Sequence, residues 1–220
     1  MSIYRDVLDQ LNQIQRNLIQ EGVVNEFRPL TTYENRSISF ENELGWMAEI
    51  RHLNYSDTYE YLRNKRLYFI SMPDEALIQI QYCFEEGDMT KHRLLYMPSP
   101  RLQSFQDDPE LYEDDVLFAD VIFKGVLPVP IRFDYDPANA QTLIHPAAHA
   151  TFGQLQNCRI PVSMPLSPRV FFDFILRSFY PTWYSQHTNC LPRDDIRMDD
   201  SIAESERRVL HFSIQQSHSA

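Results

Sequence analysis

Residues 77–97 read LIQIQYCFEEGDMTKHRLLYM. In the first half of this stretch polar and apolar side chains alternate, so the apolar ones, such as Ile80, would share one face of a β-strand. Glu86-Gly87-Asp88 is typical of a tight turn, and residues 93–97 then predict a second strand. The stretch therefore predicts an antiparallel hairpin with one apolar face.

Further strands are predicted on both sides of this hairpin. Residues 67–70 (LYFI) precede a turn at Pro73-Asp74, and residues 121–123 and 129–135 again have strand-like runs. Residues 207–214 alternate enough to be a closing strand. Together these segments predict a curved antiparallel sheet.

Two helices are predicted before the hairpin. Residues 3–21 have apolar side chains at spacings of three and four, and Gly22 stands where a helix end often takes a left-handed residue. Ser56 or Asp57 would cap a short helix that runs to Asn64.

A third helix is predicted in the C-terminal half. Ser167-Pro168 is typical of a helix start, with serine as N-cap and proline at the first helical position. The helix would end at Tyr180, before Pro181, and its apolar residues cover most of its circumference. The predicted fold class is therefore α+β, a curved antiparallel sheet with an N-terminal helix and a buried helix in the C-terminal half. We expect a single domain over residues 1–220.

The composition suits a cytoplasmic protein with a sizeable core. Hydrophobic residues make up 43% of the 220 residues and aromatic residues 13%. No apolar run reaches the roughly 18–20 residues of a membrane span, and the start is too polar for a secretory signal. The three widely spaced cysteines include no CxxC pair, which disfavours disulfides and a cysteine-rich zinc site. We expect no membrane contact.

The formal net charge of −11 argues against a general nucleic-acid coat. Seven of the negative charges lie in residues 107–120, which contain no lysine or arginine. This segment is typical of a solvated surface, although it could also dock a basic partner or mimic nucleic acid. Because the excess is local, a basic groove elsewhere stays compatible with the charge.

Signatures of nucleotide-binding folds and α/β-hydrolases are missing from the chain. It contains no GxGxxG, GxxxxGK[ST], GxSxG or HExxH, and its five glycines leave little material for a phosphate-binding loop. No cofactor is therefore predicted.

The best place for a catalytic site is the region from Arg132 to Arg159. The predicted catalytic residues there are His149, His145, Asp134, Arg132 and Arg159. One histidine, His149 or His145, would act as general acid or base. Arg132 and Arg159 would contact a phosphate and stabilise the charge that develops on it, and Asp134 would orient the site.

Two other interpretations of these residues stay open. A helical turn beginning at Pro146 would let His145 and His149 share a metal ion with Asp134 or Asp136, whereas in a strand the histidines would be about 13 Å apart. Alternatively, the charged residues form the solvated face of a strand and the histidines bond backbone carbonyls. We expect no metal.

The sharpest resemblance to a known family lies in the C-terminal half. It rests on His145-Pro146-x-x-His149-x-x-Phe152-Gly153, on Cys158-Arg159-Ile160-Pro161-Val162, and on Pro165-Leu166-Ser167-Pro168 with the aromatic residues that follow. These residues resemble an uncharacterised bacterial family, domain of unknown function 2290, over most of the chain. The resemblance implies a bacterial, cytosolic protein and supplies no activity.

A shorter run is similar to small toxins of toxin–antitoxin pairs. Arg132-Phe133-Asp134, followed by His145 and His149, resembles their Arg-Tyr-Asp and His-x-His arrangement. Ala148 and Ala150 depart from that pattern, because the toxins tend to have polar residues there. With the site above, this similarity implies a defence- or toxin-associated protein that cleaves RNA.

The alternative function is a non-catalytic protein-interaction subunit of a defence or toxin–antitoxin complex. Such a subunit would bind a partner encoded nearby through its acidic face and its aromatic cluster. Tyr180, Trp183 and Tyr184 form that cluster, and they could also stack a base or complete the core. A monomer and a dimer are both compatible with the sequence.

Overall fold

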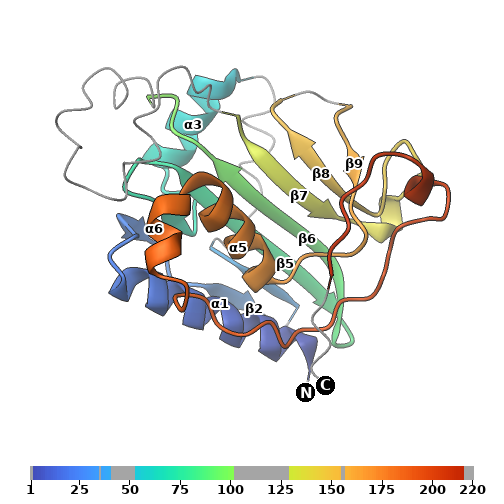
Figure 1. Cartoon of the computed structure of the whole chain (residues 1–220), viewed down its shortest axis with the longest axis horizontal. Helices are drawn as coiled ribbons and strands as arrows, with labels where there is room; N and C mark the ends of the chain where they lie inside the picture. Colours follow the sequence, from blue (N-terminus) through green and yellow to red (C-terminus); the bar gives the residue numbers. More distant parts are fainter. Residues whose placement is uncertain (1, 35, 41–52, 102–128, 155–156, 216–220) are drawn as a thin grey trace.

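The computed structural model describes residues 2–34, 36–40, 53–101, 129–154 and 157–215 (Figure 1). The strand predicted at 121–123 and the acidic segment 107–120 lie outside the described residues. The single domain over residues 1–220 stays a prediction.

A curved antiparallel sheet forms the centre of the fold, as predicted (Figure 1). Within the described residues it has nine strands, in the order β1-β4-β5-β6-β7-β8-β9, with β3 paired to β5 and β2 to β3. The strands are β1 (Glu26–Phe27), β2 (Thr31–Tyr33), β3 (Ser37–Ser39), β4 (Ile70–Ser71), β5 (Leu77–Glu85), β6 (Asp88–Met97), β7 (Ile131–Tyr135), β8 (Ala148–Phe152) and β9 (Ile160–Pro161).

β5 and β6 form the predicted hairpin. Glu85 pairs with Asp88, so only two residues make the turn. Both have positive φ, 52° at Glu86 and 99° at Gly87, which is the conformation that matches a two-residue turn to the twist of the strands. Gly87 adopts it without the steric cost that a Cβ brings.

Some strand boundaries differ from the prediction. Of residues 67–70, only Ile70 belongs to a strand, although all four side chains are buried. β6 begins at Asp88, well before the predicted 93–97, and β7 begins at Ile131. Runs of apolar residues therefore predicted which side chains are buried more reliably than they predicted where strands begin and end.

The predicted closing strand at 207–214 is wrong. The chain there forms a short 3-10 helix, η3 (Glu206–Arg208), and Phe212 makes one isolated β-bridge. Val209 is 47% exposed and Leu210 is 78% exposed. Because neither alternating set of side chains is buried, nothing selects a strand register here.

α1 (Ile3–Gln20) is the predicted N-terminal helix. Gly22 follows it with φ 72°, the left-handed conformation that closes many helix ends. The buried apolar face of α1 comprises Val7, Leu11, Ile14 and Leu18.

α3 (Tyr55–Asn64) is the predicted short helix, but its cap differs. The side chain of Asn54 accepts a hydrogen bond from the backbone N–H of Asp57 at 2.9 Å. Neither Ser56 nor Asp57 is therefore the N-cap. Asn54 satisfies an otherwise unpaired N–H of the first turn.

α5 (Pro168–Phe179) begins as predicted, because Ser167 Oγ accepts from the backbone N–H of Val170 at 3.2 Å. Pro181 then starts a second short helix, α6 (Pro181–Gln186), since proline is tolerated at the first helical position. The buried residues of α5 are Pro168, Phe171, Phe172, Ile175 and Leu176.

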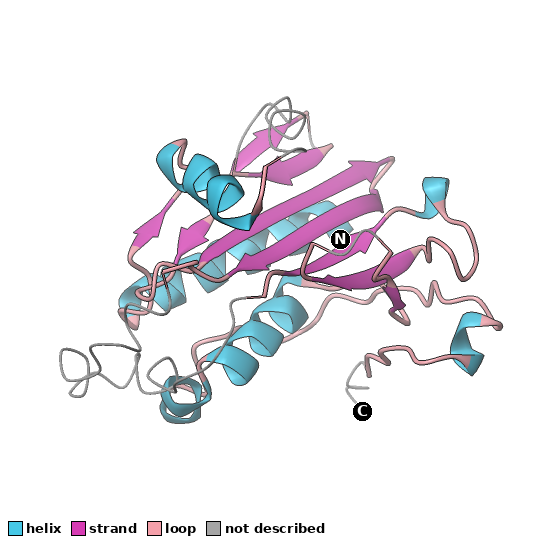
Figure 2. Cartoon of the chain, turned by 90° about the horizontal axis from the view of Figure 1, so that it is seen from above, coloured by secondary structure: helices cyan, strands magenta, loops and turns pink. Residues whose placement is uncertain are grey.

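The two faces of the sheet differ in chemistry. α5 crosses one face in Figure 1, and α3 lies on the opposite side of the sheet in Figure 2. Phe133 of β7 packs edge-to-face on Phe171 and Phe174 of α5, with ring centroids 6.2 and 5.4 Å apart. Since side chains alternate along a strand, Arg132 and Asp134 lie on the other face.

No helix in the described part of the chain is both long enough and apolar enough to span a membrane.

Candidate functional site

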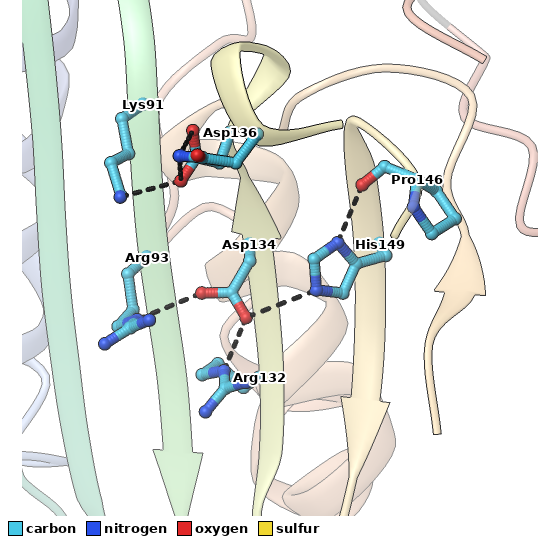
Figure 3. Close-up of polar contacts among 8 residues, drawn as sticks. Lys91, Arg93, Arg132, Asp134, Asp136, Pro146 and His149 are labelled. Atoms are coloured by element: carbon cyan, nitrogen blue, oxygen red, sulfur yellow. Dashed lines mark hydrogen bonds and ion pairs between the residues drawn. The ribbon is translucent and has the colours of Figure 1, made fainter. Parts of the chain in front are cut away.

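Asp134 of β7 contacts two arginines, Arg93 of the neighbouring strand β6 and Arg132 of its own strand (Figure 3). Arg93, which is its cross-strand partner on β6, donates from Nε to Asp134 Oδ1 at 3.0 Å. Arg132 donates from Nε to the other carboxylate oxygen. The carboxylate side chain is 10% exposed, whereas the arginines are 34% and 37% exposed. The acid is therefore buried beneath two cations that reach solvent.

The two arginines keep Asp134 ionised. Burial would raise the pKa of this carboxyl group, but the charges of Arg132 and Arg93 and their hydrogen bonds outweigh burial and lower the pKa below its usual value. The alternative interpretation, a solvated strand face, does not hold for Asp134, because this residue is 7% exposed. It orients two guanidinium groups instead.

His149 of β8 is the cross-strand partner of Asp134 on the other side (Figure 3). Its Nε2 lies 3.6 Å from Asp134 Oδ2, and its Nδ1 lies 2.9 Å from the carbonyl oxygen of Pro146. A carbonyl only accepts, so Nδ1 carries the proton and Nε2 is the basic nitrogen. The residue is 2% exposed, and burial lowers its pKa.

His145 stacks edge-on against His149, with ring centroids 4.8 Å apart. Neither the helical turn that the metal interpretation required nor a continuous strand produces this contact. Residues 141–145 form a turn closed by a β-bridge between Gln141 and His145, and the chain bends again before β8. His145 is half-buried, and its Nδ1 has no hydrogen-bond partner among the described residues.

The metal interpretation finds no support at these histidines. Nδ1 of His149 faces a carbonyl, and both oxygens of Asp134 face arginines. The described residues contain no group of three or more histidine, cysteine, aspartate or glutamate side chains placed to hold a metal ion.

Asp136 belongs to a second ion pair on the same face. Lys91 Nζ lies 2.8 Å from Asp136 Oδ2, and Asn139, at the end of the 3-10 helix η2 (Pro137–Asn139), donates to both carboxylate oxygens. Burial raises the pKa of Asp136, but these hydrogen bonds and the Lys91 charge lower it overall. The Lys91 side chain is 43% exposed and the Asp136 side chain 16% exposed, so this ion pair is more exposed to solvent than the one at Asp134.

Among the described residues, Arg159 forms no hydrogen bond or ion pair with the other four predicted catalytic residues. It precedes β9, and its Nη1 is 3.5 Å from the carbonyl oxygen of Ile144. Four of the five predicted catalytic residues thus lie together, in a chain of contacts from Arg132 to His145.

Arg93 and Lys91 were not among the residues predicted for the site. Both lie on β6 two residues apart, so they share a face, and this alternation was visible in residues 77–97. Their partners were not visible, because pairing β6 with β7 requires the register across a long connection.

The aromatic cluster after α5 completes the core. Trp183 is 3% exposed and Tyr180 is 1% exposed. Tyr184 donates to Asp173 at 2.6 Å. A stack of His187 on Trp183, with ring centroids 4.3 Å apart, covers the cluster further. These rings do not offer a free platform for a base.

The family model described as "Uncharacterized conserved protein (DUF2290)" matches residues 18–214, and the chain belongs to this family. This confirms the family resemblance found in the sequence. No curated protein and no solved structure matches the chain. The similarity to toxins of toxin–antitoxin pairs receives no support from these comparisons.

Proposed function

We propose that the chain cleaves RNA at the face of β6, β7 and β8 by histidine acid–base chemistry. The observation that carries this proposal is the line of contacts from Arg93 through Asp134 to His149 and His145 (Figure 3). Together with Arg132, which also contacts Asp134, this line joins two partly exposed guanidinium groups to a pair of imidazoles. Phosphodiester cleavage uses this set of groups.

Each group has a distinct role in this proposal. His145, the half-buried member of the pair, takes or gives the proton at the RNA. His149 is too buried to reach a substrate and positions His145. Arg132 contacts the phosphate and stabilises the charge that develops on it, and Asp134 holds Arg132 in place. The 2′-oxygen of the RNA attacks the phosphorus and forms a 2′,3′-cyclic phosphate while the P–O5′ bond breaks. The 2′-hydroxyl loses its proton and the leaving 5′-oxygen gains one; His145 serves one of these two transfers and water the other, so the reaction balances without a cofactor.

Cleavage of a labelled single-stranded RNA tests this proposal. We expect His145→Ala to lower the cleavage rate by about 100-fold or more, which is the usual contribution of a positioned acid or base. Arg132→Gln should lower the rate with the protein still folded. His211→Ala is the matched control, because His211 lies outside the cluster and bonds the Val209 carbonyl. Equal rates for His145→Ala and the control would rule the proposal out.

A second candidate function is the non-catalytic interaction subunit, and an exposed apolar tip favours it. The tip consists of Leu143, Ile144, Val209 and Leu210, which are 53%, 68%, 47% and 78% exposed. Buried Glu206 joins its two segments by accepting from the Leu143 backbone N–H at 3.0 Å. Leu143 has φ 67°, an uncommon conformation for a leucine. Exposed apolar clusters of this kind are typical of protein-binding surfaces.

Co-expression with the products of neighbouring genes tests this second function. Leu210→Asp and Ile144→Asp should abolish co-purification of a partner, while Phe27→Asp, at an apolar residue that is 52% exposed on β1, should leave it unchanged. Co-purification that survives both tip variants would exclude the tip as the docking surface.

We also propose a biological setting for this function. A bacterial defence or toxin–antitoxin system and a cytoplasmic location suit an RNA-cleaving protein, and so does a partner encoded nearby. The genes adjacent to members of this family test the setting: recurrent antitoxin or defence genes support it, and unrelated neighbours contradict it.

A further inference from the structure

A cavity of about 510 Å³ is lined by α5 and by residues 212–215 near the C-terminus. Both segments lie on the same side of the sheet (Figure 1, Figure 2). Phe133 of β7 also lines the cavity, on the face of the sheet opposite to that of Asp134. Cavities of roughly 300–1,000 Å³ are typical of sites for small molecules. The residues of this lining include none of the groups assigned to RNA cleavage.

One face of α5 forms a wall of the cavity. The residues that it contributes recur at spacings of three and four, which places them on a single face of the helix. They are Arg169, Val170, Asp173, Phe174 and Arg177. Val170 and Phe174 are only half-buried, whereas Phe171 and Phe172 of the same helix are fully buried in the core. A ligand in the cavity would therefore remove further apolar surface from water.

Backbone hydrogen bonds hold the C-terminal wall in place. The N–H of Phe212 donates to the Pro161 carbonyl oxygen at 2.9 Å, and the N–H of Ser163 donates to the Phe212 carbonyl oxygen at 2.8 Å. The N–H of Ile214 donates to Ser163 Oγ at 2.9 Å. This wall is thus formed before a ligand binds, which spares the ligand the entropy of ordering it.

The charged residues of α5 carry an excess of one positive charge, two arginines against one aspartate. Asp173 accepts from the Tyr184 hydroxyl at 2.6 Å and lies 2.9 Å from Arg169 Nη1. Arg177 is held less tightly, because its Nε lies 3.5 Å from the other carboxylate oxygen and its side chain is 67% exposed. This contact uses Nε, so the Nη groups of Arg177 can donate to a ligand.

The remaining charged residue of the lining, Asp194, belongs to the other end of α5. It accepts from Ser167 Oγ at 2.7 Å, and Ser167 is the N-cap of the helix. Arg177 lies in the last turn, about 15 Å further along at roughly 1.5 Å per residue. The end of the cavity at Arg177 therefore favours an anion.

We infer that the cavity binds an aromatic organic anion, with the ring of the ligand against Val170, Phe174 and Phe212 and its acidic group on Arg177. Phe212 is 37% exposed, so its ring is available for contact. A guanidinium group is the donor that proteins use most for carboxylates and similar acidic groups. The inference does not depend on the proposed RNA cleavage.

A pair of fluorescent probes tests the inference on the intact chain. Anilinonaphthalene sulfonate is an aromatic anion, and phenylnaphthylamine has the same rings without the sulfonate. We expect the wild type to bind the sulfonate more tightly. Arg177→Gln should weaken binding of the sulfonate by about fivefold, the size of an exposed charge contact, and leave the neutral probe unchanged. Arg16→Gln is the matched control, because Arg16 is an exposed residue of α1 outside the lining.

Filling the cavity is the second test. Val170→Trp places an indole where the ring of the ligand would lie, so the variant should bind neither probe. A thermal melt shows whether it is folded. Should it fail to fold, the Arg177→Gln comparison still decides the question, because substitution of an exposed side chain leaves the core intact.

Three results would overturn the inference. Equal affinity of the wild type for the two probes would mean that the site has no preference for an anion. Equal weakening of both probes by Arg177→Gln would remove the assigned contact with the acidic group. Undiminished binding of the sulfonate to folded Val170→Trp would place the probe elsewhere on the surface. Since neither probe is RNA, failure of the cleavage proposal leaves these outcomes unaffected.

Discussion

Two buried carboxyl groups of this protein have opposite environments. Asp74 accepts hydrogen bonds from the Tyr180 hydroxyl, 3.0 Å from each oxygen, and from the backbone N–H of Ala76. Asp134 accepts from the guanidinium groups of Arg93 and Arg132. The two residues are 5% and 7% exposed, so they are equally buried.

Their pKa values move in opposite directions. Burial raises the pKa of Asp74 to about 6, and its neutral donors only partly oppose this. The two arginine charges outweigh burial at Asp134 and lower its pKa. Neutral hydrogen-bond donors therefore do not hold the pKa of a buried acid at its usual value here, whereas formal charges lower it.

Removing the charge of Asp134 should have the largest effect. Asp134→Asn preserves the shape of the side chain but removes the negative charge that Arg93 and Arg132 share. We expect the free energy of unfolding to fall by about 2–4 kcal/mol at pH 7. Breaking a buried ion pair leaves the remaining charges partly buried without the carboxylate that stabilised them. Urea unfolding measures this. A loss below about 1 kcal/mol would mean that solvent already compensates the arginines.

The same pair has a predictable dependence on pH. The folded-state pKa of Asp134 is below its unfolded value, so its stabilisation is present above the unfolded pKa and is lost as the pH falls through the folded one. Acid unfolding of the wild type should accordingly include a contribution below about pH 4 that Asp134→Asn lacks.

Asp74 should make stability depend on pH in the opposite direction, and the effect of its substitution should be smaller. Its folded-state pKa of about 6 exceeds the unfolded value, so stability falls as the pH rises through the window between them. Asp74→Asn cannot ionise. Its stability relative to the wild type should therefore be higher at pH 7 than at pH 4, by on the order of 2 kcal/mol.

The difference between wild type and variant is the correct measure for Asp74. Burial lowers the pKa of His92 to about 4, so His92 destabilises the fold as the pH falls through much of the same range. The two effects oppose each other in the wild-type profile. A difference that does not change between pH 4 and pH 7 would contradict the assigned pKa of Asp74.

Breaking the more exposed ion pair, Lys91–Asp136, should have the smallest effect on the free energy of unfolding. Asp136→Asn breaks the contact with Lys91, whose side chain is 43% exposed. We expect a loss below about 1 kcal/mol in urea unfolding, because solvent and salt already screen such a pair. A loss as large as that of Asp134→Asn would mean that exposure does not explain the contrast between the two pairs.

Local patterns were enough to predict much of the fold. The hairpin at 77–97, α1 and the start of α5 each follow from residues that lie near one another in the chain. Gly87 at the turn and Ser167 at the N-cap act on their immediate neighbours. Such signals depend on backbone geometry over a few residues, and so they can be read without the tertiary structure.

The candidate site was predicted only in part, for a different reason. Arg132, Asp134, His145 and His149 were identified by residue type and spacing, and they do lie together. The contact of Asp134 with Arg93 joins residues 41 positions apart, and no local pattern encodes it. The wrong strand at 207–214 has the same origin, since alternation predicts a strand only where one face becomes buried.

Sequence alone thus determined the fold class, the hairpin, the main helices and the region where the charged residues gather. Tertiary structure decided which arginines face Asp134, that His149 is buried while His145 is only half-buried, and that Asp74 and Asp134 titrate in opposite directions. The physical reason is that capping and alternation act over a few residues. Strand register, burial and the electrostatic field of a site depend on segments that meet only in the folded chain.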